Sequence, residues 1–265
     1  MLGWILVAGV AVLGVPALMY LAQDSLLFFP QSLVGSPRPI RPAEDLAFDT
    51  ADGVRLRGWL VKATAAPAPL LIYYGGNAEE VSGQAREQGW PVEWSLALVN
   101  YRGYGGSEGA PSEQTLFADA LLVFDLLANR PDVDGRRIVL FGRSLGSAVA
   151  AFVAVERRVA GVILVSPFDS MTELGRYHYP WLPVGLLLRH RFDSRSRAPT
   201  ITAPMIAIVA GQDRIIPIIR SKRLFDSWGG PRRWVEVPEA DHNDLGAFPA
   251  FWEAVAGFLD AVKAI

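Results

Sequence analysis

The chain has 265 residues, of which 51% are hydrophobic and 20% charged, and its formal net charge is −2. A chain of this length buries a large core, so we expect one α/β or all-β domain with a short appendage. The basic and acidic residues are scattered along the chain and form no basic stripe, which argues against a nucleic-acid partner. There is no cysteine, and the three histidines (His178, His190, His242) are too few for a His-rich metal site. We therefore expect no metal and no cofactor.

The first 23 residues differ from the rest of the chain because they contain no Asp, Glu, Lys, Arg or His, and Trp4 to Leu21 is almost entirely apolar. As a helix, this stretch spans about 30 Å of hydrocarbon. We predict a single-pass transmembrane anchor over 1–23 and a linker over 24–42; a cleaved signal peptide and a buried core helix are the alternatives. Two following basic residues, Arg38 and Arg41, favour a cytoplasmic body but leave the side of the membrane open.

Residues 43–265 are predicted to form the catalytic domain. Leu46 to Thr50 and Val54 to Val61 flank a turn and predict a hairpin. Beyond it, short apolar runs alternate with longer helical segments, which is typical of a mostly parallel sheet with helices on both faces. The expected strands are Leu70 to Tyr74, Leu96 to Asn100, Arg137 to Phe141, Gly161 to Ser166, Met205 to Ala210 and Trp234 to Val237; the expected helices are Ser112 to Asn129, Leu145 to Glu156, Pro217 to Trp228 and Pro249 to Val262.

Residues 171–200 interrupt this alternation, because they are rich in aromatic, Pro and Arg residues. They predict a small cap over the carboxyl edge of the sheet, with an ordinary crossover helix and long loops as an equal alternative. Within this segment, Tyr177, Trp181 and Leu186 are candidate contacts for an apolar acyl chain, or they are plain core residues. Four arginines would face anionic head groups or form a solvated surface: Arg189, Arg191, Arg195 and Arg197.

A candidate nucleophile lies in Gly142-Arg143-Ser144-Leu145-Gly146, a G-x-S-x-G sequence between an expected strand and an expected helix. This context is what a nucleophile elbow requires, since glycines on both sides of the serine permit a sharp turn. The pattern predicts that the Ser144 hydroxyl is exposed above the sheet and acts as the nucleophile.

A serine hydroxyl needs a base and an acid that orients the base. His242 follows the last expected strand and is the best base, whereas His178 and His190 lie in the candidate cap and are expected to be packing or surface residues. For the acid we favour Asp213, which follows a strand and lies between the serine and the histidine. Asp169 also follows a strand and is the rival.

The aspartates beside the base, Asp241 and Asp244, are expected to be solvated or to cap local turns. Attack on a carbonyl creates an oxyanion, which two backbone N–H groups should bind. Leu145 offers one, because it directly follows the nucleophile. The second is expected from Asn77, in the Gly-rich turn after the first parallel strand, with Gly76 as the alternative donor and a further substrate contact.

Six motifs stand out along the chain: Tyr74-Gly75-Gly76-Asn77-Ala78, Asn100-Tyr101-Arg102-Gly103-Tyr104-Gly105-Gly106-Ser107-Glu108-Gly109, Pro111-Ser112-Glu113, Gly142 to Ser147, Ser166 to Ser170 and Asp213 to Pro217. Through these motifs the chain resembles the Bem46-like branch of the α/β-hydrolase superfamily over about Leu56 to Phe258, and it is similar to the eukaryotic ABHD groups. The resemblance implies Ser144 as nucleophile, Asp213 as acid and His242 as base. Members of this branch include lysophospholipid lipases and protein depalmitoylases, and many bacterial homologues carry an N-terminal anchor.

Two positions depart from the family pattern: Gly75 replaces a usual His, and Asn100 replaces a usual Asp. Neither belongs to the expected triad, but the oxyanion loop is expected to be supported differently. Arg102 and Tyr104 are expected to brace the site.

Together these features predict a membrane-anchored serine hydrolase that cleaves carboxylic esters or thioesters, with lipid-like acyl substrates and an acyl-enzyme intermediate. A serine peptidase of the acyl-aminoacyl type and a non-enzymatic membrane scaffold are the alternatives.

Overall fold

The computed structural model describes residues 2–33 and 39–263, and the side chains of residues 2–13 and of Val15 lie outside this description. Residues 34–38, in the middle of the expected linker and including Arg38, therefore lie outside the described residues.

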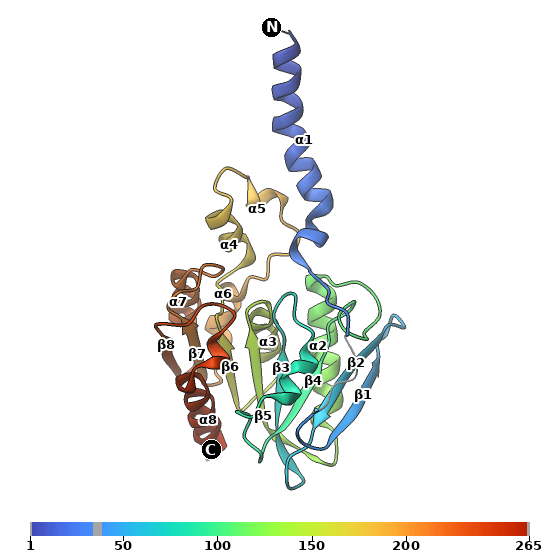
Figure 1. Cartoon of the computed structure of the whole chain (residues 1–265), viewed down its shortest axis with the longest axis vertical. Helices are drawn as coiled ribbons and strands as arrows, with labels where there is room; N and C mark the ends of the chain where they lie inside the picture. Colours follow the sequence, from blue (N-terminus) through green and yellow to red (C-terminus); the bar gives the residue numbers. More distant parts are fainter. Residues whose placement is uncertain (1, 34–38, 264–265) are drawn as a thin grey trace.

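One eight-stranded sheet forms the centre of the domain, in the order β1-β2-β4-β3-β5-β6-β7-β8 (Figure 1). The first two strands pair antiparallel, β2 pairs antiparallel with β4, and the pairs from β4 through β8 are parallel. The strands are β1 (Ala43–Asp49), β2 (Arg55–Val61), β3 (Ala68–Tyr74), β4 (Ser95–Val99), β5 (Val133–Arg143), β6 (Gly161–Val165), β7 (Met205–Ala210) and β8 (Arg232–Val237). The predicted mostly parallel sheet, with a hairpin ahead of it, is confirmed.

Helices cover both faces of the sheet, because its central strands are apolar on both sides. Every residue of β3, β6 and β7 is buried, and successive side chains enter opposite layers of core. One layer contains α2 (Glu113–Ala128), α3 (Leu145–Glu156) and α7 (Ile218–Ser227); the other contains the short helix η1 (Val81–Arg86) and α8 (Pro249–Lys263), with η3 (Leu245–Ala247) before it. The predicted covering of both faces is confirmed.

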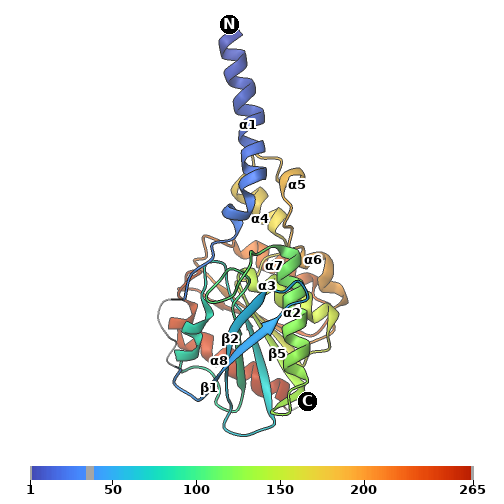
Figure 2. The same cartoon turned by 90° about the vertical axis from the view of Figure 1, so that its right-hand side faces the viewer.

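Helix α1 (Leu2–Leu27) contains Pro16 and projects away from the domain (Figures 1 and 2). In the described part of the chain, no helix has the length and apolarity needed to span a bilayer. The anchor predicted over residues 1–23 falls largely on side chains outside the description, and it stays a prediction.

The end of α1 is docked on the domain. The helix continues to Leu27, past residue 24, where the linker was expected to begin. Gln23 is buried, and its side-chain amide donates to the Leu187 carbonyl oxygen at 3.2 Å. The 171–200 segment forms α4 (Met171–His178), α5 (Val184–Leu187), α6 (Ser194–Arg197) and η2 (Ala198–Thr200). In Figure 1, α4 and α5 lie beyond the sheet, beside the lower part of α1.

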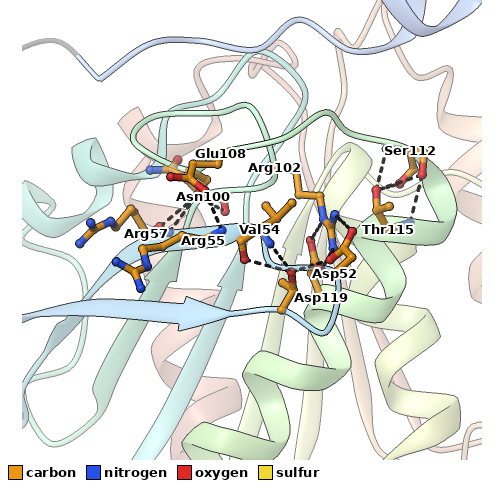
Figure 3. Close-up of polar contacts among 12 residues, drawn as sticks. Asp52, Val54, Arg55, Arg57, Asn100, Arg102, Glu108, Ser112, Thr115 and Asp119 are labelled. Atoms are coloured by element: carbon orange, nitrogen blue, oxygen red, sulfur yellow. Dashed lines mark hydrogen bonds and ion pairs between the residues drawn. The ribbon is translucent and has the colours of Figure 1, made fainter.

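Arg102 braces the loop that follows β4 (Figure 3). Its guanidinium forms bidentate contacts with Asp119 of α2, at 2.6 and 2.8 Å, and with Asp52 of the β1–β2 turn, at 2.6 and 2.9 Å. The side chains of Arg102 and Asp119 are only 7% and 9% exposed, whereas Asp52 is 59% exposed. The expectation that Arg102 is a scaffold residue agrees with these contacts.

Arg102→Ala is expected to lower the free energy of unfolding by about 3 to 5 kcal/mol, because it leaves the buried Asp119 carboxylate without its cation. Asp52→Asn is the matched control, and it should cost much less because Asp52 is exposed to water. Urea denaturation followed by fluorescence measures both. Equal losses in the two variants would contradict the importance of the buried half of this network.

Candidate active site

Ser144 lies at a sharp turn between the end of β5, at Arg143, and the start of α3, at Leu145. Its backbone has a φ of 51° and a ψ of −116°, a strained conformation for a residue with a Cβ. The turn requires glycine on both sides: a Cβ at Gly142 would collide with the backbone of Gly146, and a Cβ at Gly146 would collide with the carbonyl oxygen of Tyr74. The sequence therefore forms a nucleophile elbow with a half-buried Ser144.

His242 reaches Ser144 from the loop between β8 and η3. Its Nε2 lies 3.1 Å from the Ser144 Oγ, and its Nδ1 lies 2.7 Å from the Asp213 Oδ2. An ionised carboxylate can only accept, so Nδ1–H donates to Asp213 and Nε2 is left to accept the Ser144 hydroxyl proton. The side chains of His242 and Asp213 are 5% and 3% exposed, so water competes little for these bonds.

Asp213 is held by the backbone that follows it. The N–H groups of Ile215 and Ile216 donate to its Oδ1, at 2.9 and 2.7 Å, which leaves Oδ2 for His242. Burial raises the pKa of the Asp213 carboxyl, but the hydrogen bond and charge of His242 and the N–H of Ile216 outweigh burial, so its pKa lies below the ordinary value. The carboxyl is therefore ionised at neutral pH.

The rival acid, Asp169, lies with other partners. It is fully buried, its Oδ2 accepts from Arg220 at 2.9 Å, and its Oδ1 accepts from the N–H of Ser170. Burial raises the pKa of this carboxyl above its usual range, against the opposing effects of the Ser170 N–H and Arg220. The structure thus brings Asp213, and not Asp169, to His242.

The other two histidines have structural partners. His178 Nε2 lies 2.8 Å from the Ile215 carbonyl oxygen, and His190 contacts Asp24 through its Nε2 at 2.6 Å. The aspartates beside His242 bond locally: Asp241 accepts from the His242 N–H, and Asp244 accepts from the Asp241 N–H.

The oxyanion loop, residues 75–78, lies after β3 and beside the elbow. The Gly76 N–H donates to Glu79 Oε2 at 2.7 Å, so this alternative donor already has an acceptor. Within the described residues, the backbone N–H groups of Asn77 and Leu145 have no hydrogen-bond acceptor. These two N–H groups are therefore available to an oxygen that develops negative charge beside Ser144.

A polar network missed by the sequence reasoning links the oxyanion loop, the elbow and the histidine loop. Arg143 donates to Glu79 Oε2 at 3.1 Å, to the His242 carbonyl oxygen at 3.3 Å and to Asn243 Oδ1 at 2.9 Å. Tyr73 donates to the other oxygen of Glu79 at 2.7 Å. These residues are up to 100 positions apart in the chain, so no local pattern reveals the network.

The predicted substrate contacts of the 171–200 segment are exposed: Tyr177 is 55% exposed, Trp181 67% and Leu186 87%. They are therefore not core residues, and within the described part of the chain none of them forms a hydrogen bond with Ser144. Among the arginines, Arg189 pairs with Asp24 at 3.0 Å, and the Arg197 guanidinium lies 5.2 Å from the ring centre of Phe117.

The fold and the site define the class of protein. A family model described as serine hydrolase matches residues 124–261, and the chain belongs to this family. It is 40% identical over 236 residues to an uncharacterized protein of Mycobacterium tuberculosis, covering 87% of this chain and 84% of that protein. It is also 30% identical to an uncharacterized membrane protein of Saccharomyces cerevisiae, covering 82% of this chain and 80% of the yeast protein.

The α/β-hydrolase fold is shared with solved structures. One of them is acetyl xylan esterase 1 from Thermoanaerobacterium sp., which matches with a TM-score of 0.67, 18% sequence identity and coverage of 92% of each chain. At this identity the likeness establishes the fold alone, and it confirms the α/β-hydrolase fold expected from the sequence.

Proposed function

We propose that this serine hydrolase cleaves carboxylic esters or thioesters of lipid-like acyl groups, with Ser144 as nucleophile, His242 as base and Asp213 as the acid that orients the base. The observation that carries the proposal is the continuous hydrogen-bonded chain from the Ser144 Oγ through His242 to Asp213. The intact order of these groups and their burial are what acyl transfer requires.

In the proposed reaction, His242 Nε2 takes the Ser144 proton while Oγ attacks the acyl carbon. The carbonyl oxygen becomes an oxyanion, which the N–H groups of Leu145 and Asn77 bind. The intermediate then collapses: the bond to the leaving group breaks, and His242 returns the proton to the departing alcohol or thiol. Water, deprotonated by the same histidine, hydrolyses the acyl-enzyme and regenerates Ser144.

Exposed apolar side chains on α1, on the α4–α5 segment and beside Asp213 support lipid-like substrates. Large exposed apolar side chains gather on three neighbouring elements, and the bond between His178 and the Ile215 carbonyl joins two of these elements. Exposed apolar side chains grouped on neighbouring elements are typical of contact with a partner, a ligand or a membrane. The side chains are Leu18, Tyr20, Leu21, Leu26 and Phe29 near the end of α1; Tyr177, Tyr179, Trp181 and Leu186 in the α4–α5 segment; and Ile215, Ile218 and Ile219 beside Asp213.

We also propose that residues 1–23 hold the protein at a membrane and that the chain belongs to the Bem46-like branch. The support for the anchor is the absence of Asp, Glu, Lys, Arg and His from the sequence of this stretch and the naming of the yeast relative as a membrane protein. The support for the branch is the set of motifs around Asn77, Arg102, Ser144 and Asp213.

Hydrolysis of nitrophenyl esters from two to sixteen carbons, free and in phosphatidylcholine vesicles, tests the proposal. We expect kcat/KM to rise by about tenfold or more with each few added carbons, because each buried methylene contributes about 0.8 kcal/mol. The protein should also sediment with the vesicles. A preference for matched amides would favour the peptidase, and no hydrolysis at any length would favour the scaffold.

A further inference from the structure

The side chain of Asn77 ties the oxyanion loop to the segment that follows α1. Its Nδ2 donates to the Leu27 carbonyl oxygen at 2.5 Å, and its Oδ1 accepts from the Phe29 N–H at 3.0 Å. Asparagine presents a donor and an acceptor side by side, so it satisfies both backbone groups at once. The contacts join residues about 50 positions apart and place the end of α1 directly against the loop beside Ser144.

The same amide oxygen also fixes the loop internally. It accepts from the Tyr104 hydroxyl at 2.8 Å and from the Ala78 N–H at 3.0 Å, and Tyr104 in turn accepts from the Phe29 N–H at 3.2 Å. Ala78 has a φ of 57°, a left-handed conformation that a residue with a Cβ adopts only at a cost. A strained loop persists where its surroundings hold it, and here the holding groups converge on Asn77.

Residues 24–32, which we call the N-terminal strap, are fixed to the domain on both sides of these contacts. On one side, Phe28 is 3% exposed and its ring meets His190 and Phe192 edge-on. His190 accepts from the Glu113 N–H through Nδ1, so its Nε2 carries the proton that it donates to Asp24. On the other side, the Gly105 N–H donates to the Gln31 carbonyl oxygen at 2.7 Å, and Ser32 forms a β-bridge with Gly105.

We propose that the N-terminal strap completes the active site: through the Asn77 side chain it positions the oxyanion loop, so that the Asn77 backbone N–H points to the reacting centre. Asn77 is then a positioning residue through its side chain, and the Phe29 N–H and Leu27 carbonyl are the groups that hold it. This inference rests on the proposed acyl-transfer function. It makes the docking of α1 part of the hydrolase and not only an attachment to it.

The oxyanion loop also borders a cavity of about 760 Å³, which Asn77, Ala78, Glu79 and Arg143 line. There the Gly76 N–H donates to the Glu79 carboxylate, and Arg143 donates to the same carboxylate oxygen. Polar contacts therefore hold the loop at the cavity, and the strap supplies further polar contacts through the Asn77 side chain.

A matched pair of full-length variants, Phe29→Pro and Phe29→Ala, tests the proposal. Both lose the half-exposed ring, but only proline removes the N–H that Asn77 accepts. The readout is kcat for a short nitrophenyl ester, divided by the number of serines titrated by a fluorophosphonate. We expect Phe29→Pro to lower this kcat by about 10 to 100-fold with little change in KM, because the oxyanion exists only after attack. Phe29→Ala keeps the N–H, so its kcat should exceed that of Phe29→Pro by the same factor.

Asn77→Ala should lower kcat as Phe29→Pro does, since it retains the backbone N–H and loses only the positioning amide. The double variant Phe29→Pro/Asn77→Ala should have about the same kcat as Asn77→Ala alone, because both changes break the same contact between the Phe29 N–H and the Asn77 side chain. A role in folding alone would reduce the titrated sites and leave kcat per site unchanged, which would overturn the proposal, as would additive losses. A wild-type protein that is neither labelled nor active would instead overturn the proposed function.

Discussion

Ser144→Ala is expected to lower kcat for a nitrophenyl ester by about a millionfold, the loss seen when the nucleophile of a serine hydrolase is removed. The oxyanion donors remain, but no atom can form the acyl-enzyme. Alanine keeps the Cβ, so the strained backbone at φ 51° is neither relieved nor worsened and the unfolding free energy should change by less than about 0.5 kcal/mol. Steady-state kinetics and urea denaturation of the purified variant measure the two effects.

Fluorophosphonate labelling gives the same test without a chosen substrate. The wild-type protein should be labelled and Ser144→Ala should not. Ser147, which lies one helical turn further on and donates to the Ser144 carbonyl oxygen, supplies the control: Ser147→Ala should still be labelled. Labelling of Ser144→Ala would show that another residue is the nucleophile.

Asp213→Asn is expected to lower kcat by about 10⁴-fold. The two N–H groups of Ile215 and Ile216 both donate to the Oδ1 position, so the amide oxygen of asparagine is drawn there. Its NH2 group then faces His242 Nδ1 and makes that nitrogen an acceptor. The proton moves to Nε2, which can no longer accept from Ser144, and the stabilising charge for the imidazolium is lost.

Asp169→Asn is the matched control, because Asp169 bonds to Arg220 and Ser170 and does not contact His242. Its kcat per titrated serine should stay within a few-fold of the wild type, even if its stability falls. The ¹⁵N NMR spectrum of His242 should show the changed tautomer in Asp213→Asn. A greater loss of kcat in Asp169→Asn than in Asp213→Asn would show that Asp169, and not Asp213, is the acid of the triad.

Local sequence patterns predict the fold well here because the fold depends on local chemistry. Short, fully apolar runs such as Gly161–Val165 and Met205–Ala210 are typical of strands buried on both faces, and the Ser112 capping box starts α2 through its reciprocal bonds with Thr115. The longest strand is the instructive case: β5 runs from Val133 to Arg143, although only its apolar half, from residue 137, is recognisable. Pairing with neighbouring strands extends it through polar residues.

The candidate site also combines residues that the local sequence reveals with residues that only the tertiary structure reveals. Ser144 is recognisable because two glycines and a strand-to-helix junction lie beside it in the chain. The local sequence does not distinguish Asp213 from Asp169, since each follows a strand. The folded structure distinguishes them, because Asp169 bonds to Arg220 and Asp213 bonds to His242. The support of the oxyanion loop by Glu79, Arg143 and the N-terminal strap was invisible in the sequence.

The sequence by itself determined an α/β-hydrolase fold and serine hydrolase chemistry, because apolar periodicity and a glycine-flanked serine act over a few neighbouring residues. Only the tertiary structure decided which carboxylate meets His242 and that the end of α1 is bound to Asn77. These contacts join residues 29 and about 50 positions apart, and their energies depend on the burial and direction of side chains that the folded sheet brings together.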